Sequence, residues 1–392
     1  MTKVLTVVGT RPEIIRLSEV IKRLDATVDH VLVHTGQNYD YELNEVFFHD
    51  LGLRKPDHFL NVDTSSLGAV LGGVLIAVEK VLQDEQPDAV LVLGDTNSCI
   101  AALMARRMRI PVYHMEAGNR CFDQNVPEET NRRMVDHVSD FNLVYTEHAR
   151  RNLLAEGIHP RRILLTGSPM YEVLAAQREA IDASTIVDDL GLEPGKFFLV
   201  SAHREENVDA PDRLSALLDC LDAVVNEFGL PVLVSTHPRT RKRLEALGRQ
   251  TEGITFHKPL GFHDYNKLQL ESFCVLSDSG TIAEESTILG FPAVTLRDAI
   301  ERPEALDAGT ILMTGLHPEN VIEGVRFATS SGEPVAGTPF EYFIPNCSTR
   351  TTSFILATHR RHEHLTGLRT GNEPSRPTST PTRLHRSLET TG

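Results

Sequence analysis

Three acidic side chains occupy places in the first half of the chain where proton chemistry can occur. Asp95 follows the apolar run AVLVL, Glu116 lies in the segment HMEAGNR, and Glu128 lies in PEETNRR. Carboxylates that crowd together raise one another's pKa and can divide into an acid and a base. We therefore expect these residues to move a proton on a bound substrate.

Each of these carboxylates also has a purely structural interpretation. Asp95 can cap the helix that follows it. Glu116 can form a salt bridge with Arg120, and an acid in the first turn of a helix, such as Glu128, complements the helix dipole. A carboxylate buried at a strand end without a partner is costly, which favours the catalytic interpretation of Glu116.

A histidine and an arginine end an apolar run in the second half. His203 and Arg204 follow FFLVSA, and His237 ends the next apolar run, VLVST, in the same way. Imidazole suits proton transfer near neutral pH, and a neighbouring guanidinium suits a phosphate. The alternative is a solvated loop.

Two other segments can bind an anion. In GTRPE, Arg11 and, one turn later, Arg16 lie near a predicted helix N-terminus, where backbone N–H groups and the dipole favour negative charge. The alternative there is a helix start with two surface arginines.

The second anion-binding segment is Ser279-Gly280-Thr281, which follows CVLSD and begins a helix. Its backbone N–H groups can hold a diphosphate, and Glu285, one turn further on, can accept the hydroxyls of a ribose. Arg302 adds a cation in a later loop that a proline fixes. The alternative is an ordinary junction between a strand and a helix.

These residues follow strands in a chain that alternates short β-branched runs with amphipathic segments, which is typical of parallel α/β sheets. The rhythm restarts after the turn-rich segment 188–196, so the fold class is α/β with two Rossmann-like, doubly wound domains that face a cleft. The predicted domains are 1–170, with the acids, and 171–356, with the segment Ser279-Gly280-Thr281. The predicted strands are Val4–Val8, Val31–His34, Ala89–Leu93, Val112–Met115, Asn142–Tyr145, Ile163–Leu165, Phe197–Ala202, Val232–Thr236, Ile254–His257, Cys274–Ser277 and Ala293–Leu296.

Residues 357–392 differ in composition from the rest of the chain. They contain six Arg and three Glu among Ser, Thr, Pro and Gly, while the whole chain has a net charge of −15. We interpret the segment as a disordered basic tail. Its run HRRHEH can hold a metal weakly, but a solvated tail is the preferred interpretation.

The overall composition excludes several classes of protein. A net charge of −15 disfavours a nucleic-acid partner. No run approaches the roughly 20 apolar residues of a membrane helix, and no signal peptide is evident, so we expect a cytoplasmic protein without a membrane partner. The 5 cysteines have no metal-ligand spacing, and the first strand has no GxGxxG, so we expect neither a metal nor a nicotinamide cofactor.

Taken in order, the segments GTRPE, GDT, HMEAGNR, PEETNRR, HRxEN, SDSGTIAEES and RDAIERPE resemble the non-hydrolysing UDP-N-acetylglucosamine 2-epimerase family, from about residue 3 to about residue 355. The resemblance implies a glycosyltransferase-B-like fold, a homodimer, no cofactor, and a UDP-activated 2-acetamido sugar bound between the domains. The reaction is implied to serve the synthesis of surface-polysaccharide precursors.

The resemblance also assigns roles to residues. The catalytic groups of the family fall on Asp95, Glu116, Glu128 and His203. The expected substrate-binding residues are Arg11, Arg16, Arg204, His237, Tyr265, Ser279, Gly280, Thr281, Glu285 and Arg302. Four positions depart from the family pattern: Arg16 replaces a lysine, Thr281 a glycine, Tyr265 a phenylalanine, and Leu260 a glutamine.

The segment EAGNRCFDQNVPEETNRR resembles the branch that acts on modified sugars, such as UDP-N-acetyl-L-talosamine or UDP-diacetamido-glucuronate. In this branch Asn119, Cys121, Phe122 and Gln124 would shape the pocket around carbons 5 and 6. The alternative is an epimerase that converts UDP-N-acetylglucosamine into UDP-N-acetylmannosamine.

The implied reaction begins with loss of UDP, because the hydrogen on carbon 2 has no neighbouring carbonyl to acidify it. A carboxylate removes this proton to give a 2-acetamidoglycal, and a second group returns a proton to the other face as UDP re-adds. A glycosyltransferase of the same fold, a hydrolysing epimerase and a non-catalytic UDP-sugar sensor are the rival interpretations.

Overall fold

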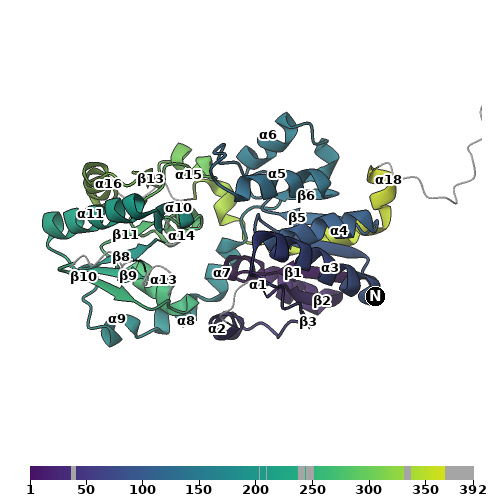
Figure 1. The fold of residues 1–392 in the computed structure, drawn as a ribbon, viewed down its shortest axis with the longest axis horizontal. Coiled ribbons are helices and arrows are strands. Elements are labelled where there is room, and N and C mark those ends of the chain that lie inside the picture. Colours follow the sequence, from purple (N-terminus) through teal and green to yellow (C-terminus); the bar gives the residue numbers. More distant parts are fainter. Residues whose placement is uncertain are drawn as a thin grey trace, which may run out of the picture.

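The structure is a computed structural model that describes residues 1–36, 41–202, 204–208, 210–236, 243, 251–330 and 337–366. It contains two parallel β-sheets, each with helices on both faces, that lie side by side (Figure 1). The predicted fold class is confirmed.

The first sheet has seven strands in the order β3-β2-β1-β4-β5-β6-β7. Its strands are β1 (Lys3–Val8), β2 (Asp29–His34), β3 (His58–Phe59), β4 (Ala89–Leu93), β5 (Val112–Met115), β6 (Phe141–Val144) and β7 (Ile163–Leu165). The helices around it are α1 (Arg11–Thr27), α2 (Tyr41–Asp50), α3 (Leu67–Glu85), η1 (Asn97–Ile100), α4 (Ala101–Arg107), α5 (Glu128–Val138) and α6 (Glu147–Ala155).

The second sheet has six strands in the order β10-β9-β8-β11-β12-β13. Its strands are β8 (Phe198–Ser201), β9 (Val232–Ser235), β10 (Ile254–His257), β11 (Cys274–Ser277), β12 (Ala293–Thr295) and β13 (Leu312–Met313). Its helices are α10 (Glu205–Val208), α11 (Pro211–Phe228), α13 (Phe262–Glu271), α14 (Ile282–Leu289), α15 (Pro303–Asp307) and α16 (Pro318–Ser330). The short helices α7 (Met170–Ala176), α8 (Arg178–Ala183) and α9 (Ile186–Asp189) lead from the first sheet to the second.

The central strand β4 shows why the sequence folds in layers. All five of its residues are buried. Its alternate side chains enter different cores: Ala89, Leu91 and Leu93 pack against α1, while Val90 and Val92 pack against α3 and α4. A strand that is buried on both faces has an unbroken apolar sequence, and this pattern is why β4 could be predicted.

The predicted strands all occur, with ends that differ by at most two residues. The sequence missed the edge strands β3 and β13, because two residues carry no recognisable periodicity. The segment after β4 begins as the 3₁₀ helix η1 and continues as α4, and of residues 239–250 the structure describes only Arg243.

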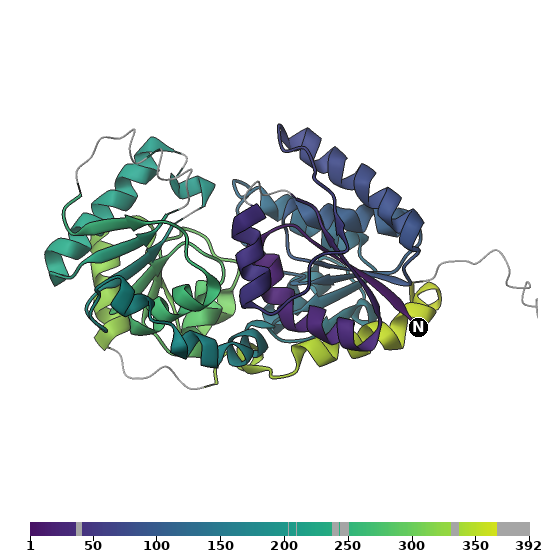
Figure 2. The ribbon, with the colours of Figure 1, turned by 90° about the horizontal axis from the view of Figure 1, so that it is seen from below.

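The C-terminal segment returns to the first domain. Helix α17 (Cys347–Thr358) packs along α1, after the short turn η3 (Phe340–Phe343) (Figure 2). Phe354 meets the rings of Tyr113 and Phe141 edge-on, and the hydroxyl groups of Tyr113 and Thr358 lie 2.7 Å apart.

The structure therefore differs from the expected boundaries at 356 and 357. The chain continues in helical form through η4 (His359–Arg361) and α18 (His362–Thr366), because apolar and hydrogen-bonding contacts with the first domain hold it there. His359 and His362 are buried rather than solvated. The remaining residues of the expected tail, 367–392, lie outside the described residues.

Within these described ranges, no helix has the length and apolar character needed to cross a bilayer.

Candidate functional site

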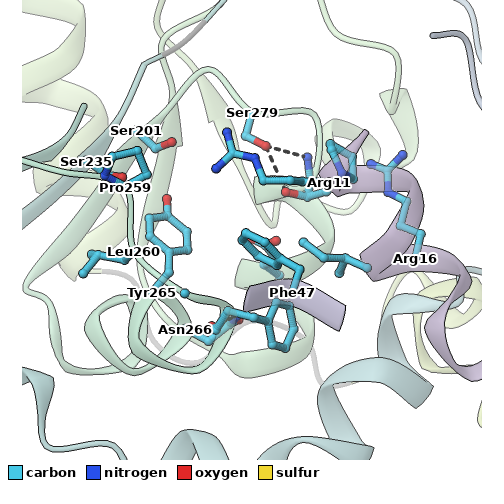
Figure 3. Close-up of a pocket in the computed structure, with 16 residues that line it drawn as sticks. Arg11, Arg16, Phe47, Ser201, Ser235, Pro259, Leu260, Tyr265, Asn266 and Ser279 are labelled. Carbon is cyan, nitrogen blue, oxygen red and sulfur yellow. Dashed lines mark hydrogen bonds between the residues drawn. The ribbon is translucent and has the colours of Figure 1, made fainter. Parts of the chain in front are cut away.

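A cavity lies between the domains at the carboxyl ends of the central strands, where a doubly wound sheet places its ligand. We call it the first chamber, and Figure 3 shows Arg11 and Phe47 from the first domain around the same space as Tyr265 and Ser279 from the second. It is lined by Arg11, Pro12, Ile15, Arg16, Phe47, Ser201, Ser235, Pro259, Leu260, Gly261, Phe262, Tyr265, Asn266, Ser279, Thr281 and Glu285.

The first chamber brings together six of the residues expected to bind substrate: Arg11, Arg16, Tyr265, Ser279, Thr281 and Glu285. Its walls include apolar side chains, among them Leu260 and Phe262, and the guanidinium of Arg11 lies 5.7 Å from the centre of the Phe47 ring. Apolar walls with a few polar groups are typical of a pocket for a planar organic group.

Glu285 is held inside this chamber by a specific partner. Gln269 on α13 donates a hydrogen bond to its carboxylate at 2.7 Å, and both side chains are buried. Burial raises the pKa of Glu285, against the effect of its hydrogen bonds. The carboxylate is thus fixed at the place where the sequence predicted an acceptor for hydroxyl groups.

A second cavity adjoins the first, and we call it the second chamber. It is lined by Pro12, Glu13, Arg16, Leu93, Gly94, Asp95, Thr96, Glu116, Arg132, Arg204, Ser279, Gly280, Thr281, Glu301 and Arg302. The two chambers share Pro12, Arg16, Ser279 and Thr281. The two chambers therefore adjoin and form one site. We call the turn before α14, where they meet, the waist of the site.

The turn before α14 can hold an anion at this waist. A Cβ atom at Gly280 would lie 3.3 Å from Nη1 of Arg302 and 3.6 Å from Nη2 of Arg204. Glycine at this position lets two guanidinium groups approach the helix N-terminus closely. Two cations at one helix N-terminus favour a phosphate group.

Glu116 lies at the centre of the second chamber and contacts both domains. It forms ion pairs with Arg16 of α1 and, at 2.7 Å, with Arg302 of the second domain. Its backbone has a φ of 62°, a left-handed conformation that is unusual for a residue with a side chain. The alternative pairing with Arg120 does not occur, because Arg120 binds Asp136 and Glu156 instead.

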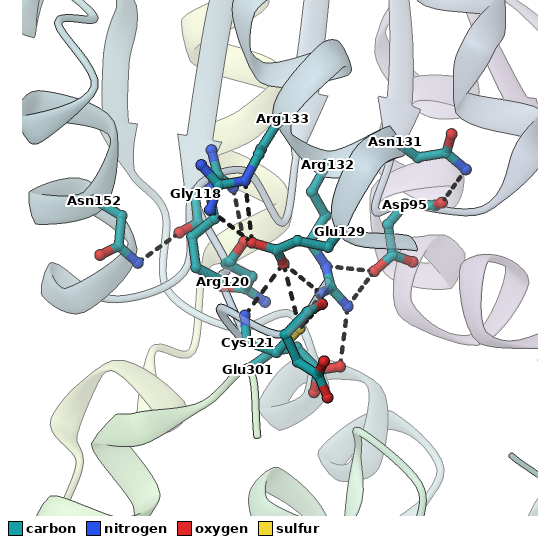
Figure 4. A network of polar contacts seen from close by, with 12 residues as sticks. Asp95, Gly118, Arg120, Cys121, Glu129, Asn131, Arg132, Arg133, Asn152 and Glu301 are labelled. Atoms are coloured by element: carbon teal, nitrogen blue, oxygen red, sulfur yellow. Dashed lines mark hydrogen bonds and ion pairs between the residues drawn. The ribbon is translucent and has the colours of Figure 1, made fainter. Parts of the chain in front are cut away.

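Asp95 is an ion-pair partner rather than a helix cap. Its carboxylate lies 2.6 Å from Arg132 of α5, and the cap position of η1 belongs to Thr96. Figure 4 shows Arg132 between Asp95, Glu129 and Glu301. The Arg132–Glu301 contact, at 3.0 Å, joins the two domains.

The buried carboxylate of Glu301 forms ion pairs with three arginines: Arg132, Arg204 and Arg297. Burial alone would raise the pKa of Glu301, but these cations outweigh burial and hold it well below the usual value. The second chamber therefore contains charges of both signs, and the carboxylates of Asp95, Glu116 and Glu301 each have an arginine partner.

The structure places the remaining predicted residues differently. Glu128 is the first residue of α5 and is half-buried, but the described linings of the two chambers do not include it. Arg204, Gly280 and Arg302 line the second chamber with Asp95 and Glu116. His203 and His237 lie outside the described residues.

The sequence did not single out Arg132, Glu301, Phe47 or Gln269. Arg132 and Glu301 belong to the segments PEETNRR and RDAIERPE, which the sequence analysis identified. Only the fold shows that these two residues face each other. Among the described residues, no group of three or more His, Cys, Asp or Glu side chains is arranged to hold a metal ion.

Comparison with known proteins gives a consistent result. Residues 22–356 match the model of a family described as UDP-N-acetylglucosamine 2-epimerase. The structure of UDP-N-acetylglucosamine 2-epimerase from Rickettsia bellii is 44% identical, with a TM-score of 0.87 over 94% of this chain and 100% of that one. The epimerase of Methanocaldococcus jannaschii, solved with UDP-GlcNAc and UDP, is 33% identical, with a TM-score of 0.84 over 91% of this chain and 100% of that one.

A relative that is named for a modified substrate also matches most of the chain. UDP-2,3-diacetamido-2,3-dideoxy-D-glucuronate 2-epimerase of Pseudomonas aeruginosa is 35% identical over 360 residues, which cover 90% of this chain and 99% of the relative. The glycosyltransferase of kitacinnamycin, at 12% identity and a TM-score of 0.57, shares the fold alone. That likeness confirms the glycosyltransferase-B-like architecture.

Proposed function

The chain belongs to the UDP-N-acetylglucosamine 2-epimerase family, and from this premise we propose that it inverts carbon 2 of a UDP-activated 2-acetamido sugar by eliminating and re-adding UDP. The observation that carries the proposal is the continuous two-chambered site. Its waist suits a diphosphate, and the carboxylates of Asp95 and Glu116 lie beyond the waist.

The proposed orientation of the substrate follows from the chemistry of each chamber. The uracil and ribose occupy the first chamber, between apolar walls and the carboxylate of Glu285. The diphosphate lies at the turn Ser279–Thr281, near Arg204 and Arg302. The sugar ring then enters the second chamber and faces Asp95 and Glu116.

In the proposed reaction the bond between the anomeric carbon and the UDP oxygen breaks first. The arginines and the N–H groups at the waist stabilise the negative charge on the departing UDP. The sugar gains oxocarbenium character, which acidifies the hydrogen on carbon 2, and a carboxylate removes it to leave a 2-acetamidoglycal. A proton delivered to the opposite face of carbon 2 and re-addition of UDP complete the inversion.

The proposed roles of the acids rest on their surroundings. Glu116 and Asp95 both line the second chamber, and each forms an ion pair with an arginine. His203 and Glu128 remain proposed proton-transfer groups. The reaction is redox-neutral and exchanges only a proton and UDP, so no nicotinamide is proposed.

We propose that the substrate belongs to the modified branch, with a sugar altered at carbon 5 or 6. The segment after β5 supports this: Asn119 is buried and its amide lies 3.3 Å from the Glu116 carboxylate, and the half-buried Cys121 follows closely. The similarity to the diacetamido-glucuronate epimerase supports it too. UDP-N-acetylglucosamine itself is the second candidate, because other relatives bear that name.

The test is turnover in heavy water with a panel of UDP-2-acetamido sugars, read at carbon 2 by NMR. We expect the product to carry deuterium at carbon 2 and UDP to remain attached. Inverted product without deuterium would exclude the elimination mechanism. Release of free sugar and UDP would indicate a hydrolysing epimerase, and activity only with an added acceptor would indicate a glycosyltransferase.

We also propose that the protein forms a homodimer through α3. Leu67 and Ile76 on this helix are 65% and 73% exposed, and Leu71 and Leu75 are only partly buried. Large exposed apolar side chains such as these are found at protein interfaces.

A further inference from the structure

We propose that His114 is a positioning residue, a doubly protonated clamp that holds the strand ends bearing Asp95 and Glu116 at a fixed separation. The inference rests on the proposed function for its catalytic consequence. Its structural part stands on hydrogen-bond geometry alone.

The contacts of His114 are all with acceptors. Nδ1 lies 2.8 Å from the Asp136 carboxylate, and Nε2 lies 2.8 Å from the carbonyl oxygen of Gly94. A carbonyl oxygen has no hydrogen to give, and the Asp136 carboxylate already accepts from the Gly118 N–H and from Arg120. Both ring nitrogens must therefore donate, which requires an imidazolium.

The balance of charge around His114 supports a cation. His114 and Asp136 are at most 1% exposed, and Arg120 is only 2% exposed. Arg120 binds Asp136 at 2.7 Å. It also binds the carboxylate of Glu156 at 2.7 Å, which has further partners in Arg133 and His137. A buried charge is tolerated when it is paired and hydrogen-bonded, and a charged His114 completes that pairing.

The clamp connects two catalytic loops. On one side, the Nε2–H of His114 holds the carbonyl of Gly94, the residue directly before Asp95. On the other side, Asp136 accepts the N–H of Gly118, two residues after Glu116. His114 thus ties the end of β4 to the loop that leaves β5.

The loop after β5 needs such support because its backbone is strained. Glu116 has a φ of 62°, which is strained for a residue with a side chain, whereas Gly118 adopts its φ of 81° without steric cost. Asn152 holds the carbonyl of Gly118 from the other side at 3.0 Å (Figure 4). A left-handed residue persists only where its surroundings fix it, and the His114–Asp136 pair is part of that surrounding.

The first test is spectroscopic and independent of activity. With histidine ring nitrogens labelled with ¹⁵N, and with His114→Gln used to assign the signal, we expect both nitrogens of His114 to carry a proton at neutral pH. A signal from a neutral tautomer would overturn the proposal.

The second test is kinetic. We expect His114→Gln to lower kcat about 10²-fold, the scale of a misplaced catalytic group, with the Kd for UDP unchanged. Asp136→Asn should give a similar loss, and the double variant should lose little more. His58→Gln is the matched control, because His58 also pairs with a carboxylate, Glu85 at 2.8 Å, but lies at the edge strand β3.

The kinetic outcomes separate the proposal from the proposed function. An unchanged kcat in His114→Gln, or an equal loss in His58→Gln, would overturn the clamp. If wild-type protein converts no sugar of the panel, the proposed function fails, and the ring-nitrogen signals still decide the state of His114.

Discussion

Glu116 is the residue in which the demands of folding and of chemistry are in conflict. Its left-handed backbone costs about 1–3 kcal/mol, and its carboxylate is only 7% exposed. Arg16 and Arg302 offset the burial of its charge, one from each domain. Strain of this kind at a cleft is characteristic of functional sites.

We predict that Glu116→Gln still binds UDP but has a kcat reduced about 10²–10⁴-fold, because an amide cannot accept the proton. Epimerisation followed by NMR and UDP binding followed by calorimetry check this result. Glu79→Gln, on the exposed side of α3, is the control. A Glu116→Gln variant with near wild-type turnover would remove Glu116 from the mechanism.

At the residue scale the sequence located strand ends but not the partners across the cleft. It identified Asp95, Glu116 and the turn at Ser279 because polar residues followed apolar runs. It missed the pairing of Arg132 with Glu301, which are separated by 169 residues. Only the relative placement of two domains determines that contact, and local periodicity contains no such information.

The packing of β2 against the edge strand β3 makes the stability of the first sheet sensitive to acid. His34, the last residue of β2, stacks on Phe59 of β3 with ring centres 4.8 Å apart, and its Nδ1 accepts the N–H of Gly36. Burial lowers the pKa of His34 from 6.5 to about 4. The folded protein therefore keeps this ring neutral at a pH where the unfolded chain is protonated.

We predict that the free energy of unfolding decreases by roughly 3 kcal/mol in all as the pH falls from 6.5 to about 4. In that range only the unfolded state binds a proton at His34. Above pH 6.5 the effect vanishes. In His34→Asn the free energy of unfolding, measured with urea, should vary less with pH over this range. His58→Asn is the control, and an unchanged slope in His34→Asn would contradict the prediction.

At the element scale the sequence was most successful where both faces of a strand are buried. The run AVLVL gave β4 with its observed bounds. The docking of α17 was not predicted, because Tyr113 and Thr358 are separated by 245 residues and the Arg-rich text after Thr358 suggested a tail. The contacts of α17 with the first domain, rather than the local composition, determine the structure of this segment.

The whole molecule is held together across the cleft by buried ion pairs. Glu301 of the second domain meets Arg132 of the first, as well as Arg204 and Arg297 of its own domain. These cations hold the pKa of Glu301 well below 4.5, despite burial. The carboxylate therefore stabilises the folded molecule above pH 4.5, and this stabilisation is lost as the pH falls toward the lowered pKa.

We predict that Glu301→Gln destabilises the protein by about 3–5 kcal/mol at neutral pH, the scale of removing one partner of a buried ion pair. The difference from wild type should shrink as the pH falls below 4.5. Unfolding in urea at several pH values measures both effects. Glu193→Gln, which breaks the exposed pair with Lys196, should change little; a comparable loss in both variants would refute the role of Glu301.

The proposed dimer gives a prediction for the assembly. Ile76→Asp should convert it to monomers, because a charge would be buried in an apolar interface. Light scattering after size exclusion measures the mass, with Lys80→Ser on the same helix as the control. A monomeric wild type, or a dimer unaffected by Ile76→Asp, would exclude α3 as the interface.

The return of α17 to α1 has a consequence for biosynthesis. A ribosome releases the N-terminus first, yet Phe354 of α17 packs edge-on against Tyr113 and Phe141 of the first domain. The first sheet cannot be completed until α17 has been synthesised, and part of its apolar surface is exposed to water until then. The domain that begins translation is therefore the one completed last.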